Sequence, residues 1–450
     1  MIYGLLLFIF FIFSAIPPLS TETTPSDPAI VLPLRKSATL PVAPTTAPTP
    51  SPTPFVPPPL ITNPSSLFLG YSVQESPVQS FPNLCINYTS YLKTVTNDID
   101  KPFMVDLNPV YKEGRLLIYA TISSMHLGYR WGEYHTNFTL LYENRIYDNL
   151  YNKGSPLPGC NQLFFDIPVA MPFSVGDVIT VSLFNLKLKR AYKDVQSCVS
   201  VPDPDPLPLA VCSYISDYNT IPELRSWIAF QRVVNVSKIM FFQATPIPGF
   251  TEAFDHLIRE GFVEVVDYTW PRLQNGMKMQ RNNQQSQVNA CFYRLKHRAS
   301  AVVLCDVDEY VHSEKYPFDL PEVVRYTRRT HPEYDLVTMG TNRYTNKEND
   351  PTQREKMLEE GKLFDAYQYR LSAHASGAFK MIAFNDFSGM LSIHVCFFCT
   401  AWKNIPLEYA RVAHFKVMVY NGTYEHSTTL SSYSPLLREE IAALKKNALL

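Results

Sequence analysis

The sequence lacks an excess of charge of either sign. Its 40 Lys and Arg residues face 41 Asp and Glu residues, so the formal net charge of the 450-residue chain is −1. Without a basic excess, no overall field attracts nucleic acid or an anionic membrane surface. We therefore expect no nucleic-acid partner.

Charged side chains are also missing from the N-terminus, where none precedes Glu22. The apolar run over residues 2–16 lies between the 7–15 residues, roughly, of a signal core and the about 20 of a spanning helix. It lacks the basic flank that fixes the orientation of a membrane segment. We expect residues 1–20 to be either a cleaved signal peptide or a signal-anchor.

Apolar side chains become scarce in residues 21–65, which are rich in Pro, Thr and Ser. Such a segment can bury too little apolar surface to offset the conformational entropy lost on ordering the chain. A disordered, extended stem is therefore predicted. This layout is typical of a Golgi membrane enzyme with a lumenal domain, and equally of a mucin-like surface protein.

Secretory features recur elsewhere in the chain. Acceptor triplets for N-glycosylation occur at Asn87, Asn137, Asn235 and Asn421. The chain has eight cysteines, an even number that favours disulfides in a secreted protein. Cys291 and Cys305 stand in apolar segments and are candidates for buried thiols.

Helical periodicity is absent from residues 66–200, where short runs of aromatic and β-branched residues alternate with turn residues. Residues 115–120, 139–142 and 178–183 are examples. A small β-rich accessory domain is predicted, ending at the stiff Pro-Asp repeat of residues 202–206.

From residue 205 to 430 the pattern changes to alternating strands and helices. Strands are expected at 209–215, 238–242, 262–266 and 301–305, with a helix capped by Thr220, one ended by Gly261 and one containing residues 288–295. The last of these strands is apolar on both faces, as in the middle of a parallel sheet covered by helices. The fold class is therefore α/β, an open, mostly parallel sheet flanked by helices, and residues 431–450 are assigned to a C-terminal tail.

Acidic residues follow the strand at 301–305 directly, as Asp306-Val307-Asp308-Glu309. Ligands bind past the carboxyl ends of strands in open α/β sheets. On an extended chain, two aspartates two positions apart point the same way and hold a hard divalent ion such as Mn²⁺ against a nucleotide diphosphate. A D-x-D motif of a nucleotide-sugar transferase is predicted.

Three other kinds of site contain acidic residues at similar spacing. A calcium-binding EF-hand loop is disfavoured by Tyr310 and Val311, and a D-x-D-x-T/V phosphatase by Tyr310. A solvated acidic turn stays open. His394 and His414 are candidates to complete a metal shell, although a single His on an apolar strand is more often a hydrogen-bonded core residue. Cys396-x-x-Cys399 is a weak zinc signal and more typical of disulfides here.

Several of these segments together resemble glycosyltransferase family 92. The resemblance spans residues 211–415 and rests on the segment 226–236, Asp306-Val307-Asp308-Glu309-Tyr310, and an ordered set of single residues: Trp270, Gln287, Asn289, Cys291, Arg294, Lys380, His394 and His414. Ser226 and Lys416 depart from the family pattern, which expects an acidic residue and an Arg.

The resemblance implies a GT-A-like fold, Mn²⁺ as cofactor, UDP-galactose as donor and an inverted, β-linked product on a glycan acceptor of a glycoprotein or glycolipid. It places Lys380, Arg294 and Gln287 with Asp306 and Asp308 in donor binding. The general base that inversion requires stays open among Glu309, Glu348, Asp350, Asp365 and Asp386, with Glu309 and Asp386 as the leading candidates. A secreted or surface glycan-binding protein with an inactive transferase-like domain is the alternative function.

Overall fold

The computed structural model describes the chain from residue 57 onward, with gaps. The segment 1–20, most of the stem, and the predicted acceptors Asn87, Asn137 and Asn421 lie outside the described residues. Among those residues, no helix is both long and apolar enough to span a membrane. The described residues are 57–75, 103–124, 138–150, 160–186, 189–268, 280–346, 351–371, 379–392, 394, 396, 397, 399, 401–415 and 423–448.

The part before the linker is built of β-strands, as predicted. One sheet has the strand order β1-β8-β7-β4-β5 and a second has the order β2-β3-β6. Their inward-facing apolar side chains form one core that includes Leu116, Phe165 and Val181. The strands are β1 (Ser72–Glu75), β2 (Phe103–Lys112), β3 (Arg115–Ser124), β4 (Phe138–Tyr142), β5 (Arg145–Asp148), β6 (Cys160–Pro168), β7 (Val178–Asn185) and β8 (Arg190–Cys198).

The part after the linker contains a mixed sheet with the order β11-β10-β9-β12-β16-β14-β15-β21, joined by β13, β19 and β20. Strands β11, β10, β9 and β12 run parallel, and β16 then enters antiparallel to β12 and β14. The strands are β9 (Ala210–Ile215), β10 (Lys238–Gln243), β11 (Val263–Asp267), β12 (Ala301–Leu304), β13 (Glu309–His312), β14 (Leu336–Thr345), β15 (Tyr369–Leu371), β16 (Phe379–Phe384), β19 (Trp402–Asn404), β20 (Arg411–Phe415) and β21 (Tyr424–His426), with β17 (Met390–Leu391) and β18 (Cys396–Phe397) paired separately.

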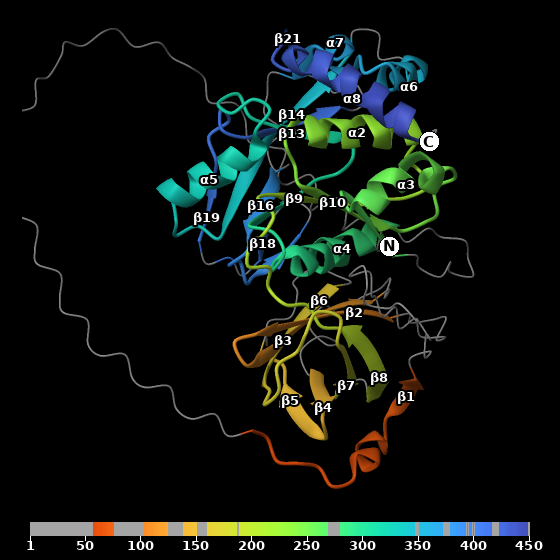
Figure 1. Ribbon diagram of the computed structural model, residues 1–450, viewed down its shortest axis with the longest axis vertical. Helices are drawn as coiled ribbons and strands as arrows, with labels where there is room; N and C mark the ends of the chain where they lie inside the picture. Colours follow the sequence, from red (N-terminus) through yellow and green to blue (C-terminus); the bar gives the residue numbers. More distant parts are fainter. Residues whose placement is uncertain are drawn as a thin grey trace, which may run out of the picture. The chain divides into compact units, whose positions relative to one another are not determined.

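Helices cover both faces of this sheet, because alternate residues of its strands are apolar on either side. Val211 and Ile239 face one core, while Ala210 and Met240 face the other. Figure 1 shows α2 and α8 on the first side and α4 on the second. The helices are α2 (Ile221–Val233), α3 (Phe250–Glu260), α4 (Gln280–Leu295), α5 (Leu320–Thr330), α6 (Pro351–Glu359), α7 (Leu363–Ala366) and α8 (Ser434–Asn447), with short 3₁₀ turns η1 (Pro64–Phe68) and η2 (Ser431–Tyr433).

The predicted helix signals lie where they were expected. The Thr220 hydroxyl accepts a hydrogen bond from the Glu223 amide at 3.4 Å and so caps α2. Gly261 ends α3 with φ 80°, a left-handed conformation that costs glycine little. Both helices consequently start or stop at the residue that the sequence indicates.

Two expectations differ from the structure. Residues 431–450, assigned to a tail, contain α8, which buries Leu437, Ile441 and Leu444 as an apolar stripe against α2 and the core. Cys291, expected as a thiol, forms a disulfide with Cys212 that joins α4 to β9. Cys305 is a buried free thiol as expected, and Cys396 pairs with Cys399.

Candidate active site

The acidic motif forms a turn at the end of β12. The Glu309 amide donates to the Asp306 carbonyl at 3.0 Å, which closes residues 306–309 into a β-turn. The expected extended conformation is therefore wrong. The turn, rather than strand alternation, sets the directions of the Asp306 and Asp308 side chains, and it leads directly into β13.

Lys380 supplies the positive charge of the site. This residue of β16 is 2% exposed, and its Nζ lies 2.8 Å from Asp306 Oδ2 and 2.9 Å from Glu309 Oε2. Burial alone would lower the pKa of Lys380, but the two carboxylates outweigh burial and raise that pKa well above its ordinary value. Lys380 is consequently a fixed cation that neutralises part of the acidic turn.

Glu309 connects the two halves of the site. Its Oε2 also accepts from the Asp306 amide at 2.9 Å, and its Oε1 lies 3.8 Å from His414 Nδ1. Burial raises the pKa of the Glu309 carboxyl, whereas Lys380 opposes this shift. Because the side chain is buried and already contacts Lys380, it suits the positioning of charge better than proton exchange with a bulky acceptor.

A second group of ligand atoms lies beside the Lys380 cluster. Asp308, Glu309 and His414 each offer one ligand atom, and these atoms lie within 4.8 Å of one another. His414 Nε2 lies 3.1 Å from Asp308 Oδ2. His414 reaches this place because β20 pairs with β13, so that His414 stands opposite Glu309. Two residues about 100 positions apart in the sequence thus meet as cross-strand neighbours.

Buried contacts from the rest of the fold fix the turn. The indole Nε1 of Trp227 on α2 donates to the Glu309 carbonyl at 2.8 Å, and the Phe415 amide donates to the Asp308 carbonyl at 3.0 Å. Trp227 itself is fully buried in the core. The backbone of the acidic motif is therefore held by α2 and β20, which both contribute residues to the core on the first side of the sheet.

Gln284 is a site residue that the sequence analysis missed. Its Nε2 donates to Asp306 Oδ1 at 2.6 Å from the first half of α4. Both Asp306 oxygens thus accept hydrogen bonds, from Gln284 and Lys380. The segment before residue 288 has no apolar periodicity that would mark it as helix. The sequence feature that could have indicated Gln284 is its position one helical turn before Gln287, which was predicted as a site residue.

The other predicted site residues are spread more widely. Gln287 is buried on α4 next to this region, and exposed His394 has its Nδ1 3.1 Å from the Phe379 carbonyl, one residue before Lys380. Neither is among the three residues of the ligand cluster. Their predicted roles in donor and metal binding stay predictions.

Arg294 and Asp386 each form an ion pair with a residue outside the ligand cluster. The Arg294 guanidinium pairs with Asp106 of β2, and both side chains are at most 6% exposed. Asp386 follows β16 and forms an exposed ion pair with Arg328 of α5 at 2.8 Å. In the antiparallel pairing of β12 and β16, Phe384 stands opposite Ala301, at the far end of β12 from the acidic turn. This placement does not suit Asp386 as a base at Asp308.

Comparison with known proteins gives the class. Residues 208–444, more than half of the chain, match glycosyltransferase family 92. The chain therefore belongs to glycosyltransferase family 92. The match covers the acidic turn, Lys380, His414 and most of α8, and it confirms the resemblance seen in the sequence. No curated protein matches the sequence.

Several solved structures show low similarity to this chain. The mannosyltransferase PcManGT from Pyrobaculum calidifontis, solved with GDP-Man and Mn²⁺, is 11% identical with a TM-score of 0.28, over 55% of this chain and 77% of that one. The glucosyl-3-phosphoglycerate synthase of Mycobacterium tuberculosis is 13% identical with a TM-score of 0.21, over 54% and 81%. HddC from Yersinia pseudotuberculosis is 12% identical with a TM-score of 0.25, over 51% and 98%. Similarity this low assigns no substrate to the chain.

Proposed function

We propose that this chain is a metal-dependent, inverting hexosyltransferase that moves galactose from UDP-galactose to a glycan acceptor of a glycoprotein or glycolipid. The observation that carries the proposal is the cluster of Asp308, Glu309 and His414 beside the buried Lys380 cation, at the end of a central strand. Membership of the family supports sugar transfer, and the choice of galactose rests on the sequence resemblance.

The ligand cluster fits a divalent cation such as Mn²⁺. Carboxylate oxygens and an imidazole nitrogen are donors that suit this ion. Asp308, Glu309 and His414 would hold it, and a bound cation neutralises charge that develops on a departing diphosphate. Asp306, also predicted as a ligand, lies outside this cluster and is engaged by Gln284 and Lys380.

The residues of the chain have distinct parts in this proposal. Asp308 is 27% exposed at its side chain, so it is more accessible to a donor than the buried Glu309. Lys380 keeps its charge at every physiological pH and contacts the Asp306 and Glu309 side chains at 2.8 and 2.9 Å. Trp227 and Gln284 hold the turn and Asp306 in place, so that the carboxylates need no rearrangement during transfer.

We place the enzyme in the secretory pathway, as a Golgi membrane protein with a lumenal catalytic domain or as a secreted form after cleavage near residue 20. This proposal is supported by the apolar N-terminus and the disulfide between Cys212 and Cys291. Immunofluorescence of the tagged full chain tests it. Residence in the cytosol would contradict it.

The activity is tested with Asp308→Asn, which removes one ligand charge at nearly constant shape. We expect roughly a 1,000-fold loss of galactose transfer from UDP-galactose, because several kcal/mol of charge stabilisation disappear. Transfer should also require Mn²⁺ and stop with chelator. The product's anomeric configuration, read by NMR, tests inversion.

Asp386→Asn is the matched control, because it makes the same chemical change on an exposed aspartate that follows β16, at the end away from the acidic turn. It should keep nearly the wild-type rate. Equal rates for wild type and Asp308→Asn would refute the proposal. Glycan binding without transfer in the wild type would instead support the inactive binding protein.

A further inference from the structure

A hollow lies away from the acidic turn, between α5, the start of β14 and β19. It has an empty volume of about 400 Å³, part of it open to solvent. Four of its ten lining residues are aromatic, and we name it the tyrosine pocket. The lining includes Tyr326, His331, Tyr334, Lys403, Asn404 and Tyr409.

The rings of the tyrosine pocket are held in fixed positions. Tyr326 and Tyr409 stack with centroids 4.4 Å apart at 16°, and Tyr316 packs against both at about 6 Å. Tyr334 lies 5.2 Å from His331, and Lys403 Nζ lies 5.7 Å from the Tyr334 ring. These contacts therefore order the rings before any ligand arrives.

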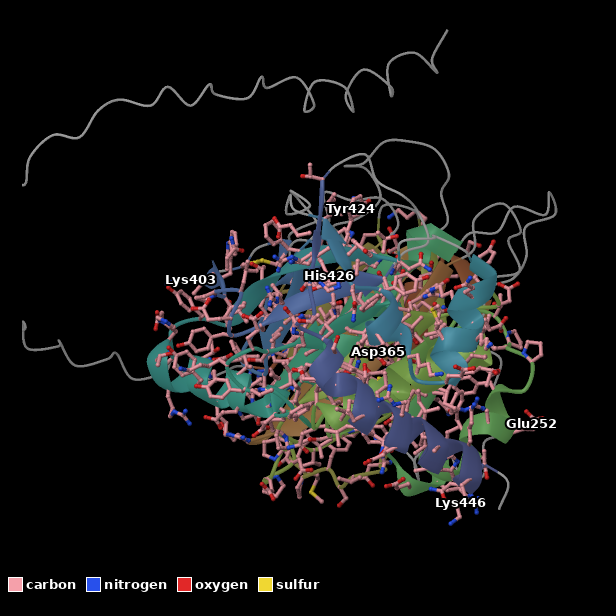
Figure 2. The ribbon with its side chains drawn as sticks, turned by 90° about the horizontal axis from the view of Figure 1, so that it is seen from above. Glu252, Asp365, Lys403, Tyr424, His426 and Lys446 are labelled. Carbon is pink, nitrogen blue, oxygen red and sulfur yellow. A yellow bond between two sulfur atoms is a disulfide. The ribbon has the colours of Figure 1, made fainter. Side chains whose placement is uncertain are left out.

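Polar groups are placed at the rim of these faces. Lys403 and Asn404 belong to the exposed strand β19, and Figure 2 shows Lys403 at the outer edge of the fold. The Thr338 hydroxyl donates to Asn404 Oδ1, so the amide nitrogen with its two donors is the outward end of that side chain. The same strand exposes the large ring of Trp402, at 52%.

This combination fits the chemistry of a neutral hexose. A pyranose ring has apolar C–H faces that pack on aromatic rings, and hydroxyls around its edge that need donors and acceptors. No carboxylate is among the residues that line the pocket, and Lys403 is its one permanently charged side chain. A cationic ligand would find no carboxylate among these residues, and a multiply charged anion would find only the one cation of Lys403.

The position of the tyrosine pocket relates it to the candidate active site. Lys403 pairs with Val337 on β14, and His414 pairs with Arg343 on the same strand. Val337 and Arg343 are six positions apart, which corresponds to about 20 Å along the strand. A short oligosaccharide covers this span, whereas a single sugar does not.

We propose that the tyrosine pocket binds a hexose unit of the acceptor glycan, remote from the unit that receives the new sugar. The inference rests on the proposed transferase function and adds a second contact that selects long acceptors over short ones. The proposal predicts that the KM for an acceptor depends on the length of that acceptor, through aromatic rings that do not contact the reacting atoms.

The test uses the full chain with Tyr409→Ala and Tyr334→Ala, and Tyr409→Phe as the control that keeps the ring. Galactotetraose and a neutral biantennary N-glycan are the long acceptors, and methyl β-galactoside is the one-ring acceptor. Each alanine variant should raise KM for a long acceptor by up to about tenfold, because one aromatic contact is lost. The kcat, the KM for methyl β-galactoside and all Tyr409→Phe values should stay unchanged.

Binding without transfer is measured separately by saturation-transfer NMR, with chelator present and Asp308→Asn in the chain. Galactotetraose should bind there and lose its signal with Tyr409→Ala or Tyr334→Ala. If binding follows this pattern but the wild type transfers no sugar, the proposed function fails and the pocket stands.

Three results would overturn the inference about the pocket. One is transfer by the wild type with the same KM for long acceptors in both alanine variants. Another is no binding of either long glycan. The third is displacement of bound galactotetraose by UDP, which would make the tyrosine pocket a nucleotide site. Because Tyr334 stands at the rim in a turn, its variant keeps the test valid even if Tyr409→Ala fails to fold.

Discussion

Lys380 is the residue on which the charge balance of the candidate site depends. Three carboxylates stand within four consecutive positions, at Asp306, Asp308 and Glu309. Like charges at this separation repel strongly in a partly buried setting. The buried ammonium contacts two of them and so permits the turn to form without a bound cation.

We expect Lys380→Met to lower the free energy of unfolding by about 3–5 kcal/mol, because it removes the buried cation that the Asp306 and Glu309 carboxyl groups contact. Urea unfolding at pH 7 measures the change. Lys446→Met is the control, since Lys446 is exposed in the last turn of α8 (Figure 2). A loss of less than about 1 kcal/mol for Lys380→Met would mean that its ion pairs behave like surface ones.

At the scale of elements, the disulfide between Cys212 and Cys291 fixes α4 to β9. Helix α4 also carries Gln284 to the acidic turn. The bridge closes a loop with a sequence separation of 79, whereas that of Cys396–Cys399 is 3. Loop-closure entropy makes the longer connection the more stabilising one.

Replacing both Cys212 and Cys291 by Ser should therefore cost about 4 kcal/mol of unfolding free energy. The pair Cys396→Ser and Cys399→Ser should cost only about half as much. Denaturant unfolding of the two double variants under oxidising conditions makes the comparison. Equal losses would show that local packing, and not loop length, sets the contribution.

Elements with strong local signals were predictable from the sequence. Strands β9, β10 and β12 are short apolar runs, and α2 begins with a capping Thr before a Pro. The acidic motif after β12 was found for the same reason. In each case the side chains that decide the structure are neighbours in the sequence.

What the sequence could not show depends on distant partners. Glu309 and His414 meet only because β13 pairs with β20, and Gln284 reaches Asp306 from a polar helix without periodicity. The turn at residues 306–309 is closed by local backbone but held by Trp227. No single residue in the sequence indicates such a contact. The roles predicted for Arg294 and Asp386 therefore took no account of the ion pairs that these residues form in the fold.

At the scale of the whole molecule, stability should depend on pH through a buried histidine. His312 of β13 is fully buried, and within the described part of the chain neither ring nitrogen has a hydrogen-bond partner. Burial, helped by the Arg411 charge, lowers the pKa of His312 to about 3. The folded state thus holds this imidazole neutral, whereas the unfolded chain protonates it near its ordinary pKa of about 6.5.

A pKa that is depressed in the folded state gives stability that is present above about pH 6.5 and is lost as pH falls towards 3. Between pH 7 and pH 5 this linkage amounts to about 2 kcal/mol. We expect His312→Phe to remove this part of the acid destabilisation, measured as the difference between urea unfolding curves at the two pH values. His426→Phe, a change at an exposed histidine of β21, should leave the difference unchanged. If His312→Phe and wild type lost equal stability on acidification, the imidazole would have to be solvated or paired in the fold, and the sheet around β13 would be more open than this structure has it.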